Sequence, residues 1–282
     1  MAAQRECAVS CVAGGGPFLF KLHSPDDCIV GGGFFSHFTI LPASFAWDAF
    51  GEKNGARTLE EMRSRIERYR SASHNPAEDY SIGCILLEQP FFFRREDWIP
   101  LPEWRRPIVR GKGFDSLGDG RAIWDRVEAL LKSSRLPELE PAIASAKAKP
   151  RFGQPQTVLP RLGQGSFRVI VTDSYARRCA FTHSPVLHVL EAAHIRPYAL
   201  GGAHAPQNGI LLRQDIHTLF DRGYVTVTPE YKIEVSRRIK EEFDNGREYY
   251  GMHGTLIQLP QAQARRPAAD FLKWHNENVY RS

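Results

Sequence analysis

The chain has 282 residues, of which 42% are hydrophobic and 11% aromatic, enough to form the cores of two ordinary domains. No run of about 18 apolar residues occurs, which excludes a membrane-spanning helix. Residues 1–16 also lack the basic start and apolar run of a secretory signal. The net charge of +5 fits a polyanionic partner such as nucleic acid, or simply a slightly basic protein. The 5 scattered cysteines favour reduced thiols and a cytoplasmic location.

The N-terminal part mixes strand and helix patterns. Residues 18–22 and the apolar run 82–87 are typical of strands. Between them, Thr58 and Glu61 form a capping box that predicts the start of a helix ending near Tyr69 or Arg70. A second helix is expected after Asp119, with an inward face of Ile123, Val127, Leu130 and Leu131.

Residues 132–160 are rich in Ser, Ala, Pro and Lys and show little apolar periodicity, which predicts a linker. From 146 to 169 the chain carries basic residues and no acidic one. This stretch is either a solvated linker or a strip that contacts phosphates. Its basic residues are Lys147, Lys149, Arg151, Arg161 and Arg168.

The C-terminal part is expected to be a compact α+β unit. Residues 174–180 look helical, 186–192 are typical of a strand, and 208–212 of a turn and strand. A helix is expected over 215–220, stopped by Asp221, Arg222 and Gly223. Residues 224–228 and 232–235 then predict a hairpin.

Chemistry-bearing residues gather between Glu191 and His217. Cleavage of a phosphodiester needs a group that takes a proton from the attacking water and a cation that absorbs the growing negative charge. A histidine with a pKa near neutrality suits the first task. His194 at the end of a strand and His217 on the facing helix could serve both, and the Asn208 amide could lock the loop between them.

This stretch resembles the HNH (ββα-metal) nucleases from about Arg161 to Val227. The resemblance is carried by GQGSFR at 163–168, RRCAFT at 177–182, EAAHIRPY at 191–198 and NGILLRQDIHTLFDRG at 208–223. It implies that His194 is the general base and that Asn208 holds the loop and can orient the base or approach the metal. It also implies that His217 is a metal ligand.

A carboxylate usually completes such a metal site, often just before the first histidine, but here that neighbour is Ala193. Glu191, Asp215 and Asp221 are therefore the candidate carboxylates. Glu191 and Asp221 are expected as metal ligands beside His217, with a bulge turning Glu191 and His194 toward one centre. Asp221 could instead be structural, and Asp215 is expected to cap its helix. Carboxylates favour Mg²⁺ or Mn²⁺, while imidazole also tolerates Ni²⁺ or Zn²⁺.

Other polar residues near this centre are open to two interpretations. Arg196, Arg213 and Arg168 could grip the scissile phosphate or be ordinary surface arginines. His188 and His204 are expected to be surface or hydrogen-bonded residues without a direct role. Cys179 is expected to be a core thiol, and Gly201 and Gly202 to let the loop turn.

The N-terminal sequence from residue 29 to residue 115 is rich in Phe, Trp and Gly. It resembles, more loosely than the nuclease segment does, the PUA-superfamily modules (EVE, ASCH and SRA-like) of modification-dependent restriction enzymes. The resemblance implies a pocket that stacks a flipped modified base between aromatic rings and reads its edge with polar groups. Core packing is the alternative for each aromatic. The expected pocket residues are Phe34, Phe35, Ser36, Trp47, Asn54, Gln89 and Trp98.

We therefore expect an α+β protein with a PUA-like β-barrel and flanking helices over 1–131, a basic linker over 132–160 and an HNH domain over 161–282. It is expected to cut double-stranded DNA containing 5-methyl- or 5-hydroxymethylcytosine and to need a divalent cation. It is also expected to contact no membrane and to form a homodimer. The alternatives are a nicking, homing or repair nuclease indifferent to modification, and a non-catalytic reader of nucleic acid.

Overall fold

The computed structural model describes residues 15–69, 78–101, 113, 119–133 and 163–282. The chain divides into two compact units. The described parts of the first are 15–39, 83–101, 113 and 119–133, and those of the second are 40–69, 78–82 and 163–282. This division differs from the expected continuous domains, because residues 40–82 group with the C-terminal residues. The expected linker, residues 132–160, lies almost wholly outside the described residues. None of the described helices is long and apolar enough to cross a membrane.

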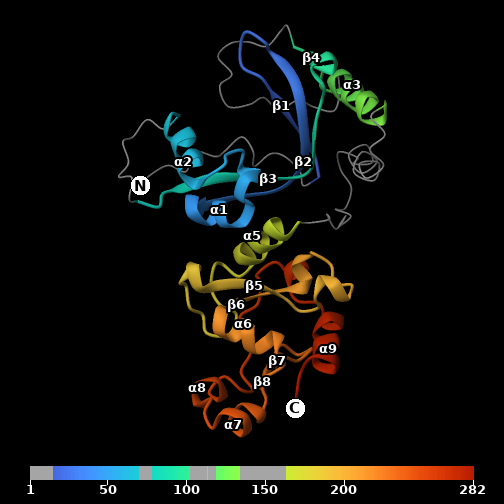
Figure 1. Ribbon diagram of the computed structural model, residues 1–282. Coiled ribbons are helices and arrows are strands. Elements are labelled where there is room, and N and C mark those ends of the chain that lie inside the picture. Colours follow the sequence, from blue (N-terminus) through green and yellow to red (C-terminus); the bar gives the residue numbers. More distant parts are fainter. Residues whose placement is uncertain (1–14, 70–77, 102–112, 114–118, 134–162) are drawn as a thin grey trace. The chain divides into compact units, whose positions relative to one another are not determined.

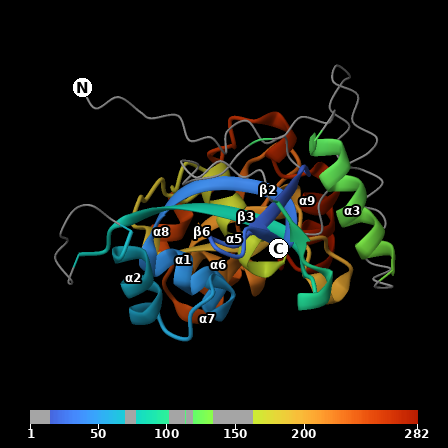
Figure 2. The ribbon, with the colours of Figure 1, turned by 90° about the horizontal axis from the view of Figure 1, so that it is seen from above.

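The first unit is built on an antiparallel sheet. The strands of this sheet are β1 (Pro17–Lys21), β2 (Cys28–Pro42), β3 (Ser81–Phe92) and β4 (Ile99–Pro100). The end of β2 from residue 40 and the start of β3 up to residue 82 are grouped with the second unit. The order is β1-β2-β3, and β4 pairs with β2. The long strands β2 and β3 run side by side (Figures 1 and 2). In the described residues this sheet is open and does not close into the expected barrel.

Helix α3 (Asp119–Ser133) covers the core of this unit, as its apolar spacing predicts. Val127 and Leu131 are buried, and Ile123 and Leu130 pack against the same cluster. Phe34, expected in a base pocket, is 4% exposed and packs against Phe91 and Trp124 of this core. The other buried members of the core are Ile29 and Ile99.

Two helices from the N-terminal half belong to the second unit. They are α1 (Ala43–Phe50), followed by a short 3₁₀ turn (Gly51–Asn54), and α2 (Leu59–Glu67). The predicted cap of α2 is confirmed, since the Thr58 hydroxyl accepts a hydrogen bond from Glu61 N at 3.2 Å. The Glu61 carboxylate accepts from Arg57 N rather than from Thr58 N, one residue earlier than a regular capping box.

The second unit continues with α5 (Gln164–Ser174), which packs on α1. The expected helix over 174–180 is wrong: Ala176 and Arg177 both have positive φ, at 50° and 60°, and the helix precedes them. A Cβ on Gly165 would collide with the carbonyl oxygen of Ala49 and the ring of Phe50. Glycine therefore allows α5 to approach α1 closely.

The rest of this unit forms a second core. Its elements are β5 (Leu190–His194), β6 (Gly209–Arg213), α6 (Gln214–Asp221), β7 (Val225–Val227), β8 (Ile233–Val235), α7 (Arg238–Phe243), α8 (Arg247–Tyr250) and α9 (Ala269–Asn278). β5 pairs antiparallel with β6. β7 pairs antiparallel with β8, which confirms the hairpin predicted over residues 224–228 and 232–235. Cys179 is fully buried here, as expected.

Candidate active site

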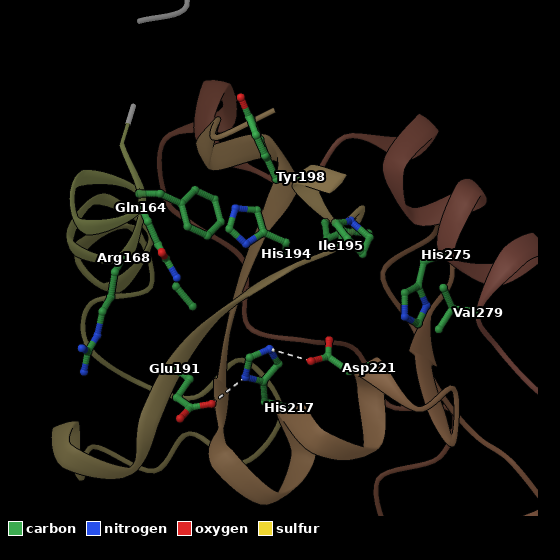
Figure 3. Close-up of a pocket in the computed structure, with 13 residues that line it drawn as sticks. Gln164, Arg168, Glu191, His194, Ile195, Tyr198, His217, Asp221, His275 and Val279 are labelled. Atoms are coloured by element: carbon green, nitrogen blue, oxygen red, sulfur yellow. Dashed lines mark hydrogen bonds and ion pairs between the residues drawn. The ribbon is translucent and has the colours of Figure 1, made fainter. Parts of the chain in front are cut away.

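A two-stranded ribbon and the helix that follows it gather the polar residues singled out above. β5 and β6 pair in unbroken register from Leu190 opposite Arg213 to His194 opposite Gly209. The bulge expected in β5 is therefore absent. Glu191 and His194 from β5, and His217 and Asp221 from α6, nevertheless line one cleft of about 560 Å³. Figure 3 shows these side chains around the cleft.

His217 lies between two carboxylates. Its Nδ1 is 2.6 Å from Glu191 Oε2, and its Nε2 is 3.3 Å from Asp221 Oδ2 (Figure 3). Asp221 follows His217 by one helical turn, so the two share a face of α6. The Asp221 side chain is 57% exposed at the cleft, yet the atoms packed around it, and to a lesser extent Glu191, raise its pKa against the opposing effect of His217.

These three side chains offer the donors that a divalent cation needs. Two carboxylates and an imidazole suit Mn²⁺, Ni²⁺ or Zn²⁺, and the carboxylates also suit Mg²⁺. Glu191 and Asp221 both flank the His217 ring, so two negative charges lie close together, where a cation would be favoured. As they stand, no three His, Cys, Asp or Glu side chains within the described residues form a metal-binding cluster. The residue types fit a cation, and Glu191, His217 and Asp221 would hold it.

His194 sits in the opposite wall of the cleft. Its ring stacks on Phe167 of α5 with a centroid separation of 3.9 Å and an angle of 11°. Its Nε2 lies 3.0 Å from Nδ1 of His204. Burial, and then the proximity of His204 and His217, lower the pKa of His194 to about 4. At neutral pH the imidazole is therefore uncharged and keeps a lone pair that can accept a proton.

Asn208 locks the loop between the strands, as the resemblance implies for this position. It is fully buried, and its Oδ1 accepts from Arg196 N at 2.8 Å. Its Nδ2 donates to the carbonyls of Arg196 at 2.8 Å and Ala203 at 2.9 Å. A Cβ on Gly202 would collide with the Arg196 carbonyl and the Asn208 amide, so Gly202 lets the loop close.

The three expected phosphate-binding arginines have different surroundings. Arg213 makes two bonds to Asp215, at 2.6 and 2.7 Å, which raises the pKa of Arg213 and lowers that of Asp215. Asp215 is thus a partner of Arg213 and not the helix cap that we expected, since the cap residue is Arg213. Arg196 donates to Leu200 O at 2.8 Å and lies over Trp274. Arg168 lines the cleft and lies 4.7 Å from the Phe45 ring centroid.

The seven expected base-pocket residues are divided between the two units. Trp47 and Asn54 belong to the second unit, and the other five to the first. Asn54 Nδ2 donates to the carbonyls of Ala46 and Gly51, while Trp47 packs against the core between α1 and α2. In the first unit, Phe35 is 8% exposed and Ser36 donates to Glu88 at 2.6 Å.

Gln89 and Trp98, the remaining two residues of the expected pocket, also lie in the first unit. Gln89 has a positive φ of 47° in β3. Trp98 lies beneath the guanidinium of Arg95, 5.7 Å from the ring centroid. The base pocket expected from the sequence therefore stays a prediction.

Sequence reasoning missed two side chains that contact His194. Phe167 lies within the GQGSFR segment, and an aromatic ring at that point of a buried helix could have been proposed as a platform. His204 was expected to be a surface or hydrogen-bonded residue, and its hydrogen bond is to the proposed base itself. A lone histidine in a loop gives no periodic signal that could have placed it there.

Comparison with known proteins agrees with this geometry. Residues 179–228 match the HNH endonuclease family. A search of the curated proteins finds no match. Among solved structures, a "Modification dependent TagI restriction endonuclease" is similar at 18% identity and a TM-score of 0.31, over 40% of this chain and 37% of that one. The chain thus spans well under half of that protein. The segment that holds Glu191, His194, Asn208, His217 and Asp221 is an HNH endonuclease domain.

Proposed function

We propose that the protein hydrolyses DNA phosphodiester bonds at the cleft between β5 and α6. The observation that carries this proposal is the position of His194 in the same cleft as the Glu191, His217 and Asp221 group. A base that is uncharged at neutral pH is the group that hydrolysis by water requires. The donor set opposite it suits the cation that such cleavage requires.

In the proposed reaction, water attacks the phosphorus and its oxygen forms the new P–O bond. His194 accepts the proton that this water loses, and the bond to the leaving 3′ oxygen breaks. Phe167 keeps the imidazole plane fixed by stacking, and Asn208 holds the loop that follows His194. When bound, a divalent cation supplies positive charge for the phosphate oxygens in the transition state. Glu191, His217 and Asp221 provide its ligands.

Plasmid cleavage with several divalent ions tests this proposal. Wild type should convert supercoiled plasmid in Mg²⁺ or Mn²⁺, and His194→Ala should be slower by about 10²-fold to 10⁴-fold, the usual contribution of a general base. His188→Ala is the matched control, because His188 is exposed and lies outside the cleft. Equal rates for wild type and His194→Ala would reject the nuclease proposal and favour a non-catalytic reader of nucleic acid.

We also propose that the first unit is a PUA-like reader that directs cleavage to DNA with 5-methyl- or 5-hydroxymethylcytosine. Phe92 of β3 supports this, because it is 73% exposed and stacks on Phe20 of β1 at 5.7 Å and 25°. Gly31 of β2, which pairs with Phe20, leaves room for the Phe92 ring. Phe20 is half-buried beneath it, so the exposed Phe92 ring offers a surface on which a nucleobase can stack.

A panel of unmodified, methylated and hydroxymethylated plasmids tests the reader. Phe92→Ala should lose the preference for modified plasmid while keeping the cleavage rate on unmodified plasmid. Phe243→Ala, an exposed phenylalanine of the second unit, should keep that preference. Equal cleavage of all three plasmids by wild type would reject the reader and favour a nicking, homing or repair nuclease. One centre cuts one strand, so linear product formed without a nicked intermediate would indicate the expected homodimer.

A further inference from the structure

His204 is held in place beside His194 by a second aromatic contact. Its ring stacks on Tyr198 with a centroid separation of 4.5 Å and an angle of 11°. The rings of His194 and His204 meet nearly edge to face, at 67° and 5.0 Å, with Nε2 of one 3.0 Å from Nδ1 of the other. Phe167, His194, His204 and Tyr198 therefore form a continuous series of ring contacts, two stacked and one edge to face, which fixes both imidazoles.

The hydrogen bond between the two imidazoles has two possible directions. Either Nε2–H of His194 donates to His204, or Nδ1–H of His204 donates to His194. In the first case Nδ1 of His194 carries a lone pair, and within the described residues no side chain or backbone group bonds to that atom. In the second case Nδ1 of His194 carries the proton, and the neutral ring has no free lone pair for the attacking water.

Only the first direction survives the proton transfer. After His194 accepts a proton on Nδ1, its Nε2–H still donates to the lone pair of His204, and the bond becomes charge-assisted. In the second direction, protonated His194 and His204 would each present N–H to the other, and the bond would break during the reaction. A bond that persists in both protonation states needs no rearrangement in the transition state.

We propose that His204 is a positioning residue, whose Nδ1 accepts Nε2–H of His194 and so leaves Nδ1 of His194 as the atom that accepts a proton. The proposal rests on the proposed function of His194 as the base. In this proposal His204 contacts neither DNA nor the reacting atoms and acts only through His194. The proposal also assigns Tyr198 the task of holding the His204 ring in the required orientation.

Three substitutions at one position separate this role from a general structural one. In His204→Asn the amide oxygen takes roughly the place of Nδ1, whereas in His204→Gln it reaches toward the place of Nε2. We expect His204→Ala and His204→Gln to lower kcat about 10-fold or more, up to the 10²-fold to 10⁴-fold contribution of the base itself, with KM unchanged. His204→Asn should keep kcat within about threefold of wild type, since the acceptor is restored. Equal losses in the Asn and Gln variants would overturn the assignment.

A measurement of the tautomer tests the same bond without cleavage. Nitrogen-15 NMR of the histidine rings at pH 7.5 should show neutral His194 with its proton on Nε2 in the wild type. His204→Ala should give a mixture of both tautomers, and His188→Ala should leave His194 unchanged. A wild-type proton on Nδ1 would overturn the proposal, and this result needs no variant to fold. If the protein cuts no DNA, the proposed function fails, while the tautomer still reports on His204.

Discussion

At the scale of single residues, His217 is the centre of the site because both of its ring nitrogens face carboxylates. Glu191 Oε2 is the closer partner, at 2.6 Å. A cation bound by these groups would stabilise the native state according to its concentration and affinity, by about 2.7 kcal/mol at 100 times Kd. We expect Mn²⁺ to raise the Tm of the wild type, and Glu191→Gln or His217→Ala to abolish most of that rise.

Glu230→Gln is the matched control for this thermal shift, because Glu230 is an exposed acid in the turn between β7 and β8. It should respond to Mn²⁺ as wild type does. An undiminished rise in both Glu191→Gln and His217→Ala would place the cation elsewhere. Because the measurement needs no DNA, it tests the metal site independently of cleavage.

His275 makes stability depend on pH. It is 2% exposed on α9, its Nε2 donates to Phe220 O at 3.1 Å, and its Nδ1 lies 2.8 Å from the Thr226 hydroxyl. Burial lowers its pKa from 6.5 to about 4, because the charged ring loses its hydration. The unfolded chain therefore binds a proton more readily than the native protein does between these two pH values.

The stability that neutral His275 contributes is full above about pH 6.5 and is lost as the pH falls toward 4. The shift of about 2.5 pKa units corresponds to roughly 3 kcal/mol. We expect urea unfolding midpoints to fall steeply over this range in wild type, and less steeply in His275→Gln. His188→Gln should keep the wild-type slope, and the same slope in His275→Gln would contradict the assignment.

The gathering of the site residues could be predicted from the sequence because these residues lie in order on local elements. The spacing from Glu191 to His194 to His217 depends on one ribbon and one helix, and the structure places these side chains in one cleft. The contact between His194 and His204 could not be predicted in this way. It depends on how the loop closes around Asn208, which sequence periodicity does not encode.

At the scale of elements, α5 shows why helix prediction failed in one place. Residues 166, 167 and 169–172 are all buried, so the helix lacks the polar face that reveals amphipathic periodicity. Its β-branched run favours a strand by local propensity. By contrast, α2, α3 and α6 each keep an exposed face. The sequence predicted both ends of α2 and α6, and the start of α3, within a few residues.

The contact between α5 and α1 depends on Gly165. A Cβ there would meet the backbone carbonyl of Ala49, which cannot rotate away. We expect Gly165→Ala to lower the free energy of unfolding by about 1–3 kcal/mol, the usual cost of overpacking. Gly163→Ala is the control two residues earlier, where a Cβ meets nothing within 4 Å. Chemical denaturation of both variants measures the difference, and equal stabilities would contradict a close approach of these helices.

At the scale of the whole molecule, the division into units was not predictable from composition. The domain boundary expected near residue 131 was based on the segment rich in Pro, Ser and Lys, and such a composition marks where the chain is polar. It does not mark which helices share a core. Residues 40–82 join the nuclease unit because Phe45 and Ala46 are each 1% exposed and α1 packs on α5. Long-range burial of this kind leaves no local signature in the sequence.

This organisation predicts what happens when the chain is cut between residues 134 and 160. A protease site inserted there would separate α1 and α2 covalently from the HNH domain. Because α1 and α5 belong to one packed unit, the two pieces should stay associated and elute together in size-exclusion chromatography. Adding Gly165→Leu to the cut protein should release them, since the larger side chain collides with the Ala49 carbonyl and the Phe50 ring. Two separate peaks from the cut protein without this substitution would show that residues 40–82 do not belong to the nuclease unit.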